Sequence, residues 1–499
     1  MIDTKALRSR ILDLAIQGKL TEQLPSDGTA DDLLSHINKE KIELIQKRKI
    51  PKEKPLPEIS ADEKAFEIPN NWKWVRVQDI ATYITDYVAN GSFATLKAHT
   101  QTYKEPNYAI FVRTMDFSSD FKSDCSYIDK ESYDFLEKSR LYGGELILPN
   151  IGASIGKAFI MPDLGMPMSL APNSILLKFT EPVMNIYFSF IVKSRFGSNL
   201  LNITQGGSAT AKFSKTDLRS LIVPIPPIAE QKRIVERVEE IFRLLDAIDE
   251  AQEKYSTDVD SLKAKLITAG IQGKLTEQLD SDGTAEELYQ QIQEEKQKLI
   301  KEGKIKKEKP LPAISDEEIP FEIPGNWKWV RFGEITTKIT SGSTPPGGKK
   351  GNSYVPKGFC FFREQNIYND GIHHDGMVFI NEELLNTRQN STVIANDILL
   401  NITGGSIGRC AIIPSDFDRG SINQHILIIR LVDTNMRYYI HQIICSPYVQ
   451  KLIKSKAVGD KDGFSGGRCK NTLIPLPPLA EQKRIAEVLE RAMGAVDRL

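Results

Sequence analysis

The chain has 499 residues, of which 40% are apolar and 26% are charged. This length favours three domains or a duplicated pair, and the composition permits buried cores beside long exposed helices. A net charge of −1 disfavours a protein that binds nucleic acid alone, so a DNA-binding role requires local basic patches or a basic partner.

The N-terminal part predicts two helices followed by an extended linker. Residues 5–24 carry apolar positions at three- and four-residue steps, as at the end of a helix. Thr29 and Asp32 form a capping-box pattern, which predicts a second helix over 29–50. The proline-rich sequence KEKPLP then predicts an extended linker that ends before FEIPNNWKWVRVQDI.

A long helix is predicted over 228–272, in the middle of the chain. Pro226 and Pro227 suit its first turn, and Gly273 suits its end. Its apolar residues form a narrow stripe flanked by Glu, Lys and Arg, which is typical of a coiled coil. At 1.5 Å per residue, a helix of roughly 45 residues is about 65 Å long.

The chain contains a tandem repeat. AIQGKLTEQL at Ala15 returns as GIQGKLTEQL at Gly270, and KEKPLP and NWKWVR return at the same offset. IVPIPPIAEQKRI at Ile222 returns as LIPLPPLAEQKRI at Leu473. Repeats of such long period indicate a duplicated architecture. In this alignment both chain ends fall inside the central helix, so the two terminal helices, placed end to end, match a second copy of it.

These repeats predict an α+β fold: a tandem duplication of two α/β domains separated by long antiparallel coiled-coil helices, pseudo-two-fold and circular in organisation. The predicted segments are 1–71 (helices and linker), 72–222 (first variable domain), 223–326 (central helical spacer), 327–473 (second variable domain) and 474–499 (C-terminal helix). The chain lacks a signal peptide and any run of eighteen apolar residues, so we expect a soluble, cytoplasmic protein with no membrane partner.

The two variable domains share a skeleton but not their polar loops. ELILPNIGASIGKAFIMP in the first matches DILLNITGGSIGRCAIIP in the second, and both indicate short strands joined by turns. The polar segments 86–105 and 205–215 have no resemblance to their counterparts 341–358 and 457–470. A duplication that keeps its scaffold while its loops diverge suggests recognition of two different ligands.

No motif in the chain indicates catalysis or a metal. Gly152 to Lys157 resembles a phosphate-binding loop, but its glycines are one residue too close, so we expect a tight turn between strands. His373 and His374 have no third ligand at a familiar spacing. The five cysteines form no Cys-x-x-Cys pair and are expected to be reduced thiols. Nuclease and adenine-methyltransferase motifs are also absent.

Polar and basic residues in the variable domains are the candidates for DNA contacts. Arg, Lys, Asn and Gln pair with base edges, while hydroxyls and basic groups hold phosphates. Each residue alone could belong to an ordinary solvated loop, but the set favours recognition. The candidates are Ser92, Phe93, Thr95, Lys97, Arg113, Ser154, Lys157, Ser208, Thr210, Lys212, Ser341, Ser343, Lys349, Lys350, Arg363, Gln365, Asn366, Ser406, Arg409 and Arg468.

Through QGKLTEQL, NWKWVR, the Gly-x-Ser-Ile-Gly turns and PxPPxAEQKRI, the whole chain resembles the specificity (S) subunit of type I restriction–modification systems. The resemblance implies that 72–222 and 327–473 are target-recognition domains, each reading one half of an asymmetric bipartite site in double-stranded DNA. It also implies assembly with two methyltransferase (M) subunits and with restriction (R) subunits.

In such a complex the partner subunits would hold S-adenosylmethionine, ATP and Mg²⁺, and this chain would be non-catalytic and carry no cofactor. Two other classes remain open at this stage. One is a coiled-coil adaptor whose domains bind proteins; the other is a self-contained methyltransferase, which would have to transfer methyl groups without partners. The sequence sets neither the target bases nor the gap between half-sites.

Overall fold

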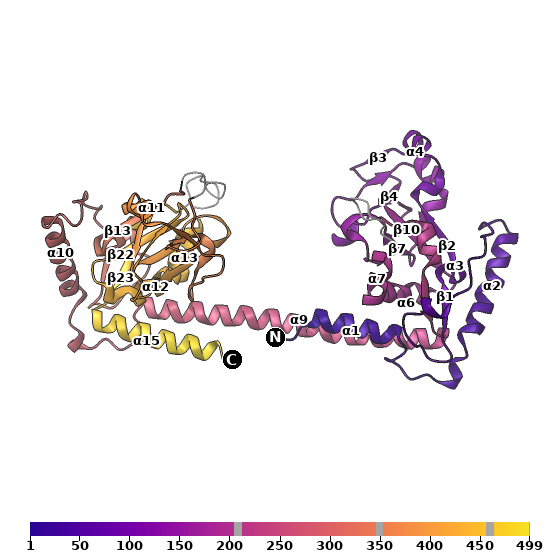
Figure 1. Cartoon of the computed structure of the whole chain (residues 1–499), viewed down its shortest axis with the longest axis horizontal. Coiled ribbons are helices and arrows are strands. Elements are labelled where there is room, and N and C mark those ends of the chain that lie inside the picture. Colours follow the sequence, from indigo (N-terminus) through magenta and orange to yellow (C-terminus); the bar gives the residue numbers. More distant parts are fainter. Residues whose placement is uncertain (204–211, 346–352, 456–463, 499) are drawn as a thin grey trace. The chain divides into compact units, whose positions relative to one another are not determined.

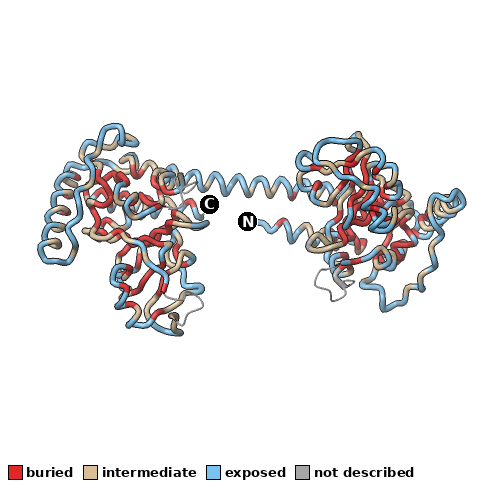
Figure 2. Tube along the Cα trace, turned by 90° about the horizontal axis from the view of Figure 1, so that it is seen from above, coloured by how far each residue is buried: buried red, intermediate tan, exposed pale blue. Residues whose placement is uncertain are grey.

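The computed structural model describes residues 1–203, 212–345, 353–455 and 464–498. The chain divides into two compact units, Met1–Glu253 (unit 1) and Lys254–Leu499 (unit 2), and the boundary lies inside helix α9 (Ile228–Ile271) (Figure 1). This 44-residue helix confirms the helix predicted over 228–272. Each unit has its own buried core, whereas the middle of α9 is exposed (Figure 2).

Unit 1 is built from two main sheets and a short strand pair. A four-stranded antiparallel sheet has the order β2-β10-β7-β8, and a five-stranded sheet has the order β3-β5-β4-β9-β6 with one parallel pair, β4 and β9. The strands are β1 (Lys73–Arg76), β2 (Ala81–Asp86), β3 (Thr102–Tyr103), β4 (Ala109–Val112), β5 (Tyr127–Ile128), β6 (Arg140–Leu141), β7 (Leu146–Pro149), β8 (Phe159–Ile160), β9 (Met168–Leu170), β10 (Ser174–Phe179) and β11 (Ile222–Ile225).

The remaining helices of unit 1 surround these sheets. They are α1 (Thr4–Ile16), α2 (Ala30–Gln46), α3 (Val77–Ile80), α4 (Phe93–His99), α5 (Lys130–Phe135), α6 (Pro182–Lys193), α7 (Arg195–Ile203) and α8 (Lys215–Ser220). The predicted capping box is confirmed at α2: the Thr29 hydroxyl accepts from the Asp32 backbone N–H, and the Asp32 carboxylate accepts from Thr29. Leu33 and Ile37 bury the inner face of this helix.

Unit 2 repeats the main sheet in the order β13-β22-β19-β20, beside a second sheet in the order β17-β14-β21-β18 and a small hairpin, β15-β16. Its strands are β12 (Lys328–Arg331), β13 (Thr336–Ser341), β14 (Phe359–Phe362), β15 (Ile367–Tyr368), β16 (Gly371–Ile372), β17 (Val378–Ile380), β18 (Thr392–Ile394), β19 (Ile398–Asn401), β20 (Cys410–Ile412), β21 (Arg419–Ile422), β22 (Ile426–Leu431) and β23 (Leu473–Leu476). Its other helices are α10 (Ala285–Lys301), α11 (Glu382–Asn386), α12 (Arg437–Cys445), α13 (Pro447–Ser455), α14 (Gly466–Asn471) and α15 (Leu479–Val496).

Each domain begins and ends on one antiparallel strand pair. β1 pairs with β11 in unit 1, and β12 pairs with β23 in unit 2. The chain therefore enters and leaves each domain side by side. The predicted boundaries at 222 and 473 fall on the first residues of β11 and β23, so the rest of each strand belongs to the predicted helical segments although it pairs with its domain.

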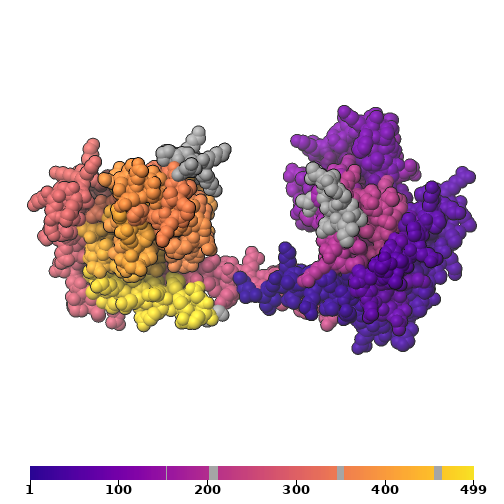
Figure 3. Space-filling view, in the orientation of Figure 1, coloured from indigo at the N-terminus to yellow at the C-terminus, as the bar shows by residue number. Residues whose placement is uncertain are grey.

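Each terminal helix packs on α9 within its own unit. In unit 1, Thr4 donates to Asp249 (2.5 Å) and Arg8 pairs with Asp246 (2.7 Å), so α1 runs antiparallel to the first half of α9. In unit 2, α15 (yellow) lies along the lower edge of that unit in Figure 3. Its C-cap residue Asp497 forms an ion pair with Lys263 of α9. The predicted second spacer consists of these two terminal helices, and each of them packs against α9 in its own unit.

The repeated sequence motifs meet at one buried junction in each unit. In unit 1, the buried carboxylate of Glu230, in AEQKRI, accepts hydrogen bonds from Trp72 (2.8 Å) and Gln23 (2.8 Å). Glu481 accepts the same bonds from Trp327 (2.8 Å) and Gln278 (2.8 Å) in unit 2. The three motifs are therefore parts of one polar cluster in each unit, which ties the entry strand to α9 in unit 1 and to α15 in unit 2.

A glycine lets the chain approach this junction closely. Gly18 adopts a φ of +68°, and a Cβ atom there would lie 2.4 Å from the ring of Pro69. Gly273 has a φ of +69° and the same relationship to Pro324, at 2.3 Å. Since only glycine accepts this φ and this contact without strain, the Gly in QGKLTEQL is required by packing.

None of the helices in the described ranges combines the length and apolar character that crossing a membrane requires.

Candidate nucleic-acid interface

Four polar segments of unit 2 meet at the ends of its strands: 341–344 after β13, 363–366 after β14, 401–406 after β19 and 423–425 after β21. The Glu364 carboxylate accepts from Asn423 Nδ2 (2.7 Å), and the Glu364 carbonyl accepts from Asn401 Nδ2 (2.8 Å). Burial acts to raise the pKa of Glu364, but the hydrogen bond from Asn423, a backbone hydrogen bond and the nearby Arg363 guanidinium bring that pKa below its usual value. The carboxylate therefore stays charged and holds three of the segments together.

The segment 341–344 is held by two further contacts. Arg388, which is 8% exposed, donates to the Ser343 carbonyl and, at 3.3 Å, to the Ile422 carbonyl. Thr344 donates its hydroxyl hydrogen to Gln424. The predicted residues Ser341 and Ser343 are both exposed and lie at this meeting point.

The Gly-x-Ser-Ile-Gly segments are tight turns between antiparallel strands, as predicted. Gly152 to Ser154 forms one 3-10 turn between β7 and β8, and Gly404 to Ser406 forms its counterpart between β19 and β20. The glycines that flank these turns have φ between +72° and +89°, which favours glycine. Because the turn joins two strands rather than a strand and a helix, it is not a nucleotide-binding loop.

A basic residue follows each turn, at Lys157 and at Arg409. Lys157 is exposed, and no carboxylate among the described residues forms an ion pair with it. The Arg409 guanidinium stacks over the Tyr368 ring (4.3 Å), which in turn stacks on His373 (4.1 Å). His373 also pairs with Asp370 (3.0 Å), and it lies on the hairpin β15-β16 and not in a metal site. Ser154 and Ser406 lie within the turns and are partly exposed.

The segment around Ser92 is a helix, which corrects its interpretation as a loop. Ser92 is the N-cap of α4, where its hydroxyl accepts from the Thr95 backbone N–H (3.3 Å), and Leu96 is buried beneath. A Ser N-cap followed by an apolar residue four positions later stabilises such a turn. Phe93 is 75% exposed, and Lys97 is also exposed, so α4 presents an apolar ring and a cation to solvent.

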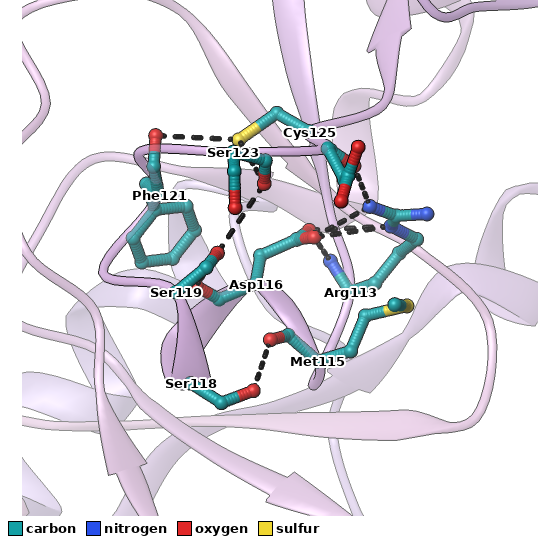
Figure 4. A network of polar contacts seen from close by, with 9 residues as sticks. Arg113, Met115, Asp116, Ser118, Ser119, Phe121, Ser123 and Cys125 are labelled. Carbon is teal, nitrogen blue, oxygen red and sulfur yellow. Dashed lines mark hydrogen bonds and ion pairs between the residues drawn. The ribbon is translucent and has the colours of Figure 1, made fainter. Parts of the chain in front are cut away.

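Arg113 lies in a dense polar network at the end of β4 (Figure 4). Its guanidinium pairs with the buried carboxylate of Asp116 (2.6 Å) and donates to the Asp124 carbonyl. The same carboxylate accepts from the Arg113 backbone N–H (2.7 Å) and raises the pKa of the guanidinium. Arg113 therefore shapes the loop 113–125, in which Cys125 donates to the Phe121 carbonyl (3.4 Å).

Asn366 lies in the interior rather than on the loop surface. It is fully buried, its amide oxygen accepts from the Arg363 backbone N–H (3.1 Å), and its amide nitrogen donates to the His373 carbonyl (3.0 Å). Asn366 thus occupies the place that Asp116 takes in unit 1, three residues after an arginine. Gln365 is exposed, and Arg363 is partly exposed and donates to the Gly376 carbonyl.

The other predicted residues fall into two groups. Lys212 is exposed and forms a β-bridge with Ile151, which places it beside the turn of unit 1. Arg468 lies in the first turn of α14, capped by Ser465, and not in a loop. The second group lies outside the described residues: Ser208, Thr210, Lys349 and Lys350.

The described residues contain no group of three or more His, Cys, Asp or Glu side chains that could hold a metal ion. All five cysteines are free, as predicted. Burial raises the pKa of the Cys445 and Cys469 thiols to about 12 and lowers the pKa of His441, so these groups are neutral at physiological pH. Their environment suits core packing.

Sequence reasoning missed Asn423, Gln424 and His425, which lie between β21 and β22. His425 Nδ1 lies 2.6 Å from the Thr403 hydroxyl, in the segment that leads into the turn of unit 2. One signal was present in the sequence: after the shared Ser-Ile or Ser-Leu pair, this tripeptide replaces the Ala171-Pro172-Asn173 of the first copy. A polar tripeptide between two apolar strands is therefore a candidate for ligand contact, as the longer polar loops are.

The described part of unit 2 thus presents a cluster of polar segments at the ends of strands from two sheets, and unit 1 repeats the main four-stranded sheet with different side chains at the matching positions. A family model described as type I restriction modification DNA specificity domain matches the chain twice, at 69–254 and 324–496. The chain belongs to this family of type I restriction–modification DNA specificity proteins. Each match contains one copy of the repeated four-stranded sheet.

Relatives agree with the family, and a solved structure shares the fold. The specificity subunit of the type I restriction enzyme EcoAI from Escherichia coli is 27% identical over 99% of this chain and 90% of its own length. The EcoEI specificity subunit from the same organism is 29% identical over 68% of this chain and 63% of its own. A structure described under the assembly and conformational transition of the type I R-M system matches with a TM-score of 0.57 at 16% identity, covering 87% of this chain and 93% of that one. That structure shares the fold of this type I specificity protein.

Proposed function

We propose that this chain is the DNA-recognition subunit of a type I restriction–modification complex, in which each unit reads one half of an asymmetric bipartite site. The observation that carries the proposal is the double family match, because each match covers one of the two repeated sheet domains. The comparisons favour DNA recognition over the adaptor alternative. A self-contained methyltransferase has no support, because we find no methylation motif in the chain.

The polar segments are proposed to enter the major groove, where all four base pairs are distinguishable. Exposed cations beside them, including Lys97, Lys157 and Lys212, are proposed to contact phosphates and to position the domain without reading sequence. Asymmetry follows from the difference between the two sets of side chains. In unit 2, the hydroxyl groups of Ser341 and Ser343 are also proposed to contact phosphates.

Helix α9 is proposed to set the distance between the half-sites, together with a second spacer built from both terminal helices. A 44-residue helix rises about 66 Å, which exceeds the roughly 34 Å of one DNA turn. Dimeric DNA readers fix half-site spacing in the same geometric way. We also propose that these two spacers form an antiparallel coiled coil and that the molecule has pseudo-two-fold symmetry.

The partners in this proposal are two methyltransferase subunits and restriction subunits, which would carry S-adenosylmethionine, ATP and Mg²⁺ in the cytoplasm. The chain itself is proposed to be non-catalytic. Its net charge of −1 is consistent with partners that supply much of the phosphate contact. The outer faces of α2, α9 and α10 are proposed as their docking surface.

A domain exchange tests the two-reader proposal. Residues 72–222 are replaced by the corresponding domain of another family member, and the complex is assembled with its methyltransferase partners. Sequencing of methylated bases should show one half-site changed and the other retained. A change in both half-sites, or methylation without any sequence preference, would contradict the proposal.

A further inference from the structure

Gln424 lies where the four polar segments of unit 2 meet, and its amide is held on both sides. Its Oε1 accepts the hydroxyl hydrogen of Thr344, and its Nε2 lies 3.0 Å from Nε2 of His425. The residue is nevertheless exposed. An exposed glutamine normally loses side-chain rotamer entropy when it binds a ligand. The hydrogen bonds of Gln424 restrict its rotamers before any ligand binds, so this entropy cost is smaller.

In the structure the amide nitrogen of Gln424 faces His425 and the amide oxygen faces Thr344. An amide NH₂ only donates, so His425 Nε2 must accept and carries no proton. In the neutral imidazole the proton then lies on Nδ1, which donates to the Thr403 hydroxyl 2.6 Å away. On the other side the amide oxygen accepts from Thr344. One orientation of the Gln424 amide thus satisfies both neighbours.

The support behind His425 continues into the buried part of the domain. The His425 backbone N–H donates to Asn423 Oδ1 (3.0 Å), and its carbonyl accepts from the Ile402 N–H (2.9 Å). Asn423 is 6% exposed and donates to the Glu364 carboxylate (2.7 Å). Base-contacting residues need such support, because a poorly held side chain discriminates weakly.

Among the described residues, one N–H and one oxygen lone pair of the Gln424 amide have no hydrogen-bond partner. This pair of groups matches the major-groove edge of adenine, where N7 accepts and N6 donates, and Gln bound at two points is the usual reader of that base. By comparison, no side-chain hydrogen bond holds the amide of exposed Gln365 among the described residues. The Gln424 amide is therefore held in place by hydrogen bonds, whereas in the described part of the chain the Gln365 amide is not.

The corresponding segment of unit 1 cannot make this contact. There the three residues are Ala171, Pro172 and Asn173, with Pro172 in the place of Gln424. Neither alanine nor proline has a polar side chain, and Asn173 adopts a φ of +72°. The contact would therefore contribute to one half-site only, as an asymmetric target requires.

We propose that Gln424 is a specificity-determining residue that reads an adenine in the half-site bound by unit 2, and that Thr344 and His425 are its positioning residues. The proposal rests on the DNA-recognition function proposed above and names one of its contacts.

The test uses the complete complex with its methyltransferase partners and a library of randomised duplex DNA, with sequencing of the methylated products. Gln424→Ala should reduce the preference for adenine at one position by about 5- to 100-fold, which corresponds to the usual discrimination of a two-point base contact. Gln424→Glu keeps the size but removes the donor, and should move the preference at that position towards cytosine, whose N4 donates. His425→Phe should relax the same position and no other.

Pro172→Ala in unit 1 is the matched control and should leave both half-sites unchanged. If the wild-type complex methylates a bipartite site and both Gln424 variants read the same bases at every position, the inference is wrong while the proposed function stands. If the wild-type complex methylates without sequence preference, the proposed function itself fails. Loss of binding to all sequences in both Gln424 variants would also contradict the inference, because it assigns Gln424 a single base pair.

Discussion

The indole nitrogen of Trp72 donates to Oε2 of Glu230 across 2.8 Å, and Trp327 makes the same 2.8 Å bond to Glu481. Residues 158 and 154 positions apart in the sequence thus form one buried pair in each unit. The bond joins the strand that enters each domain to the long helix or its C-terminal counterpart. It fixes the position of the first strand of the domain relative to the helix. A helix that sets the distance between two domains requires such a fixed attachment.

Removing this bond from one unit should destabilise that unit alone. Trp72→Phe leaves the Glu230 carboxylate buried with one donor fewer, which should cost about 1–3 kcal/mol of unfolding free energy. Hydrogen exchange followed by mass spectrometry should show faster exchange in 17–24 while 272–279 keeps its protection. Trp327→Phe is the matched control, with the opposite pattern. Equal loss of protection in both segments would show that the two junctions are not independent.

The junction should also give the chain an acid sensitivity. The hydrogen bond from Arg233 lowers the pKa of Asp27, and Arg484 does the same for Asp282. A carboxyl whose folded pKa lies below its unfolded value, about 3.9, contributes stability above that pH. This contribution is lost as the pH falls through the folded pKa, so the relevant window lies below about pH 4.

The measurement is the free energy of unfolding between pH 3 and pH 7. Asp27→Asn should be less stable than the wild type at neutral pH, and the two proteins should converge as the pH falls below 4. Asp120→Asn is a suitable control, because Asp120 pairs with Lys122 on the exposed surface, where an ion pair contributes little. A constant difference between Asp27→Asn and wild type at all pH values would contradict the assignment.

Exposed lysines of unit 1 should contribute to DNA affinity without setting sequence. Lys97→Ala combined with Lys157→Ala removes two cations, so the slope of log affinity against log salt should fall by about 0.9 for each phosphate that is no longer neutralised. Fluorescence anisotropy of the assembled complex on labelled duplexes at several salt concentrations measures this slope. Lys122→Ala, a paired surface cation, should leave it unchanged. An altered methylation sequence in the double variant would indicate base contacts instead.

Lengthening α9 should change the gap between half-sites. Four residues inserted after Glu253, in the exposed stretch of the helix, add about 6 Å of rise, close to two base pairs. They also rotate the following part of the helix by about 40°. Sequencing of methylated bases should therefore show either a longer gap or loss of methylation. Both half-sites should keep their bases; a changed half-site would mean that α9 does more than set distance.

Local sequence patterns predicted the helices well where a periodic stripe and a cap agreed. The capping box at Thr29 and the heptad-like spacing of 228–272 are local signals, and α2 and α9 follow them. The segment around Ser92 was read as a loop because its glycine and polar residues outweighed a short capped turn. The segment is helical because Leu96 is buried in one core cluster with residues of β4 and β5. Those strands lie later in the chain, so the local sequence does not show this packing.

For the candidate DNA-contact residues, the sequence could not predict the exposure of each side chain. Asn366 and Gln365 are neighbours in the chain, yet one is buried and the other exposed, because a tight turn after β14 points them in opposite directions. Arg113 looked like a free cation until the fold brought Asp116 and the Asp124 carbonyl to it. Residue type alone carries no information about such partners.

The sequence by itself determined the duplication, the long helix and the family, because repeats and periodicity are written along the chain. Only the tertiary structure decided that Trp72, Glu230 and Gln23 form one cluster, and that Gln424 stands held between Thr344 and His425. These contacts join segments up to 207 residues apart. They depend on strand order and register, which arise from the packing of the whole domain and not from any local pattern.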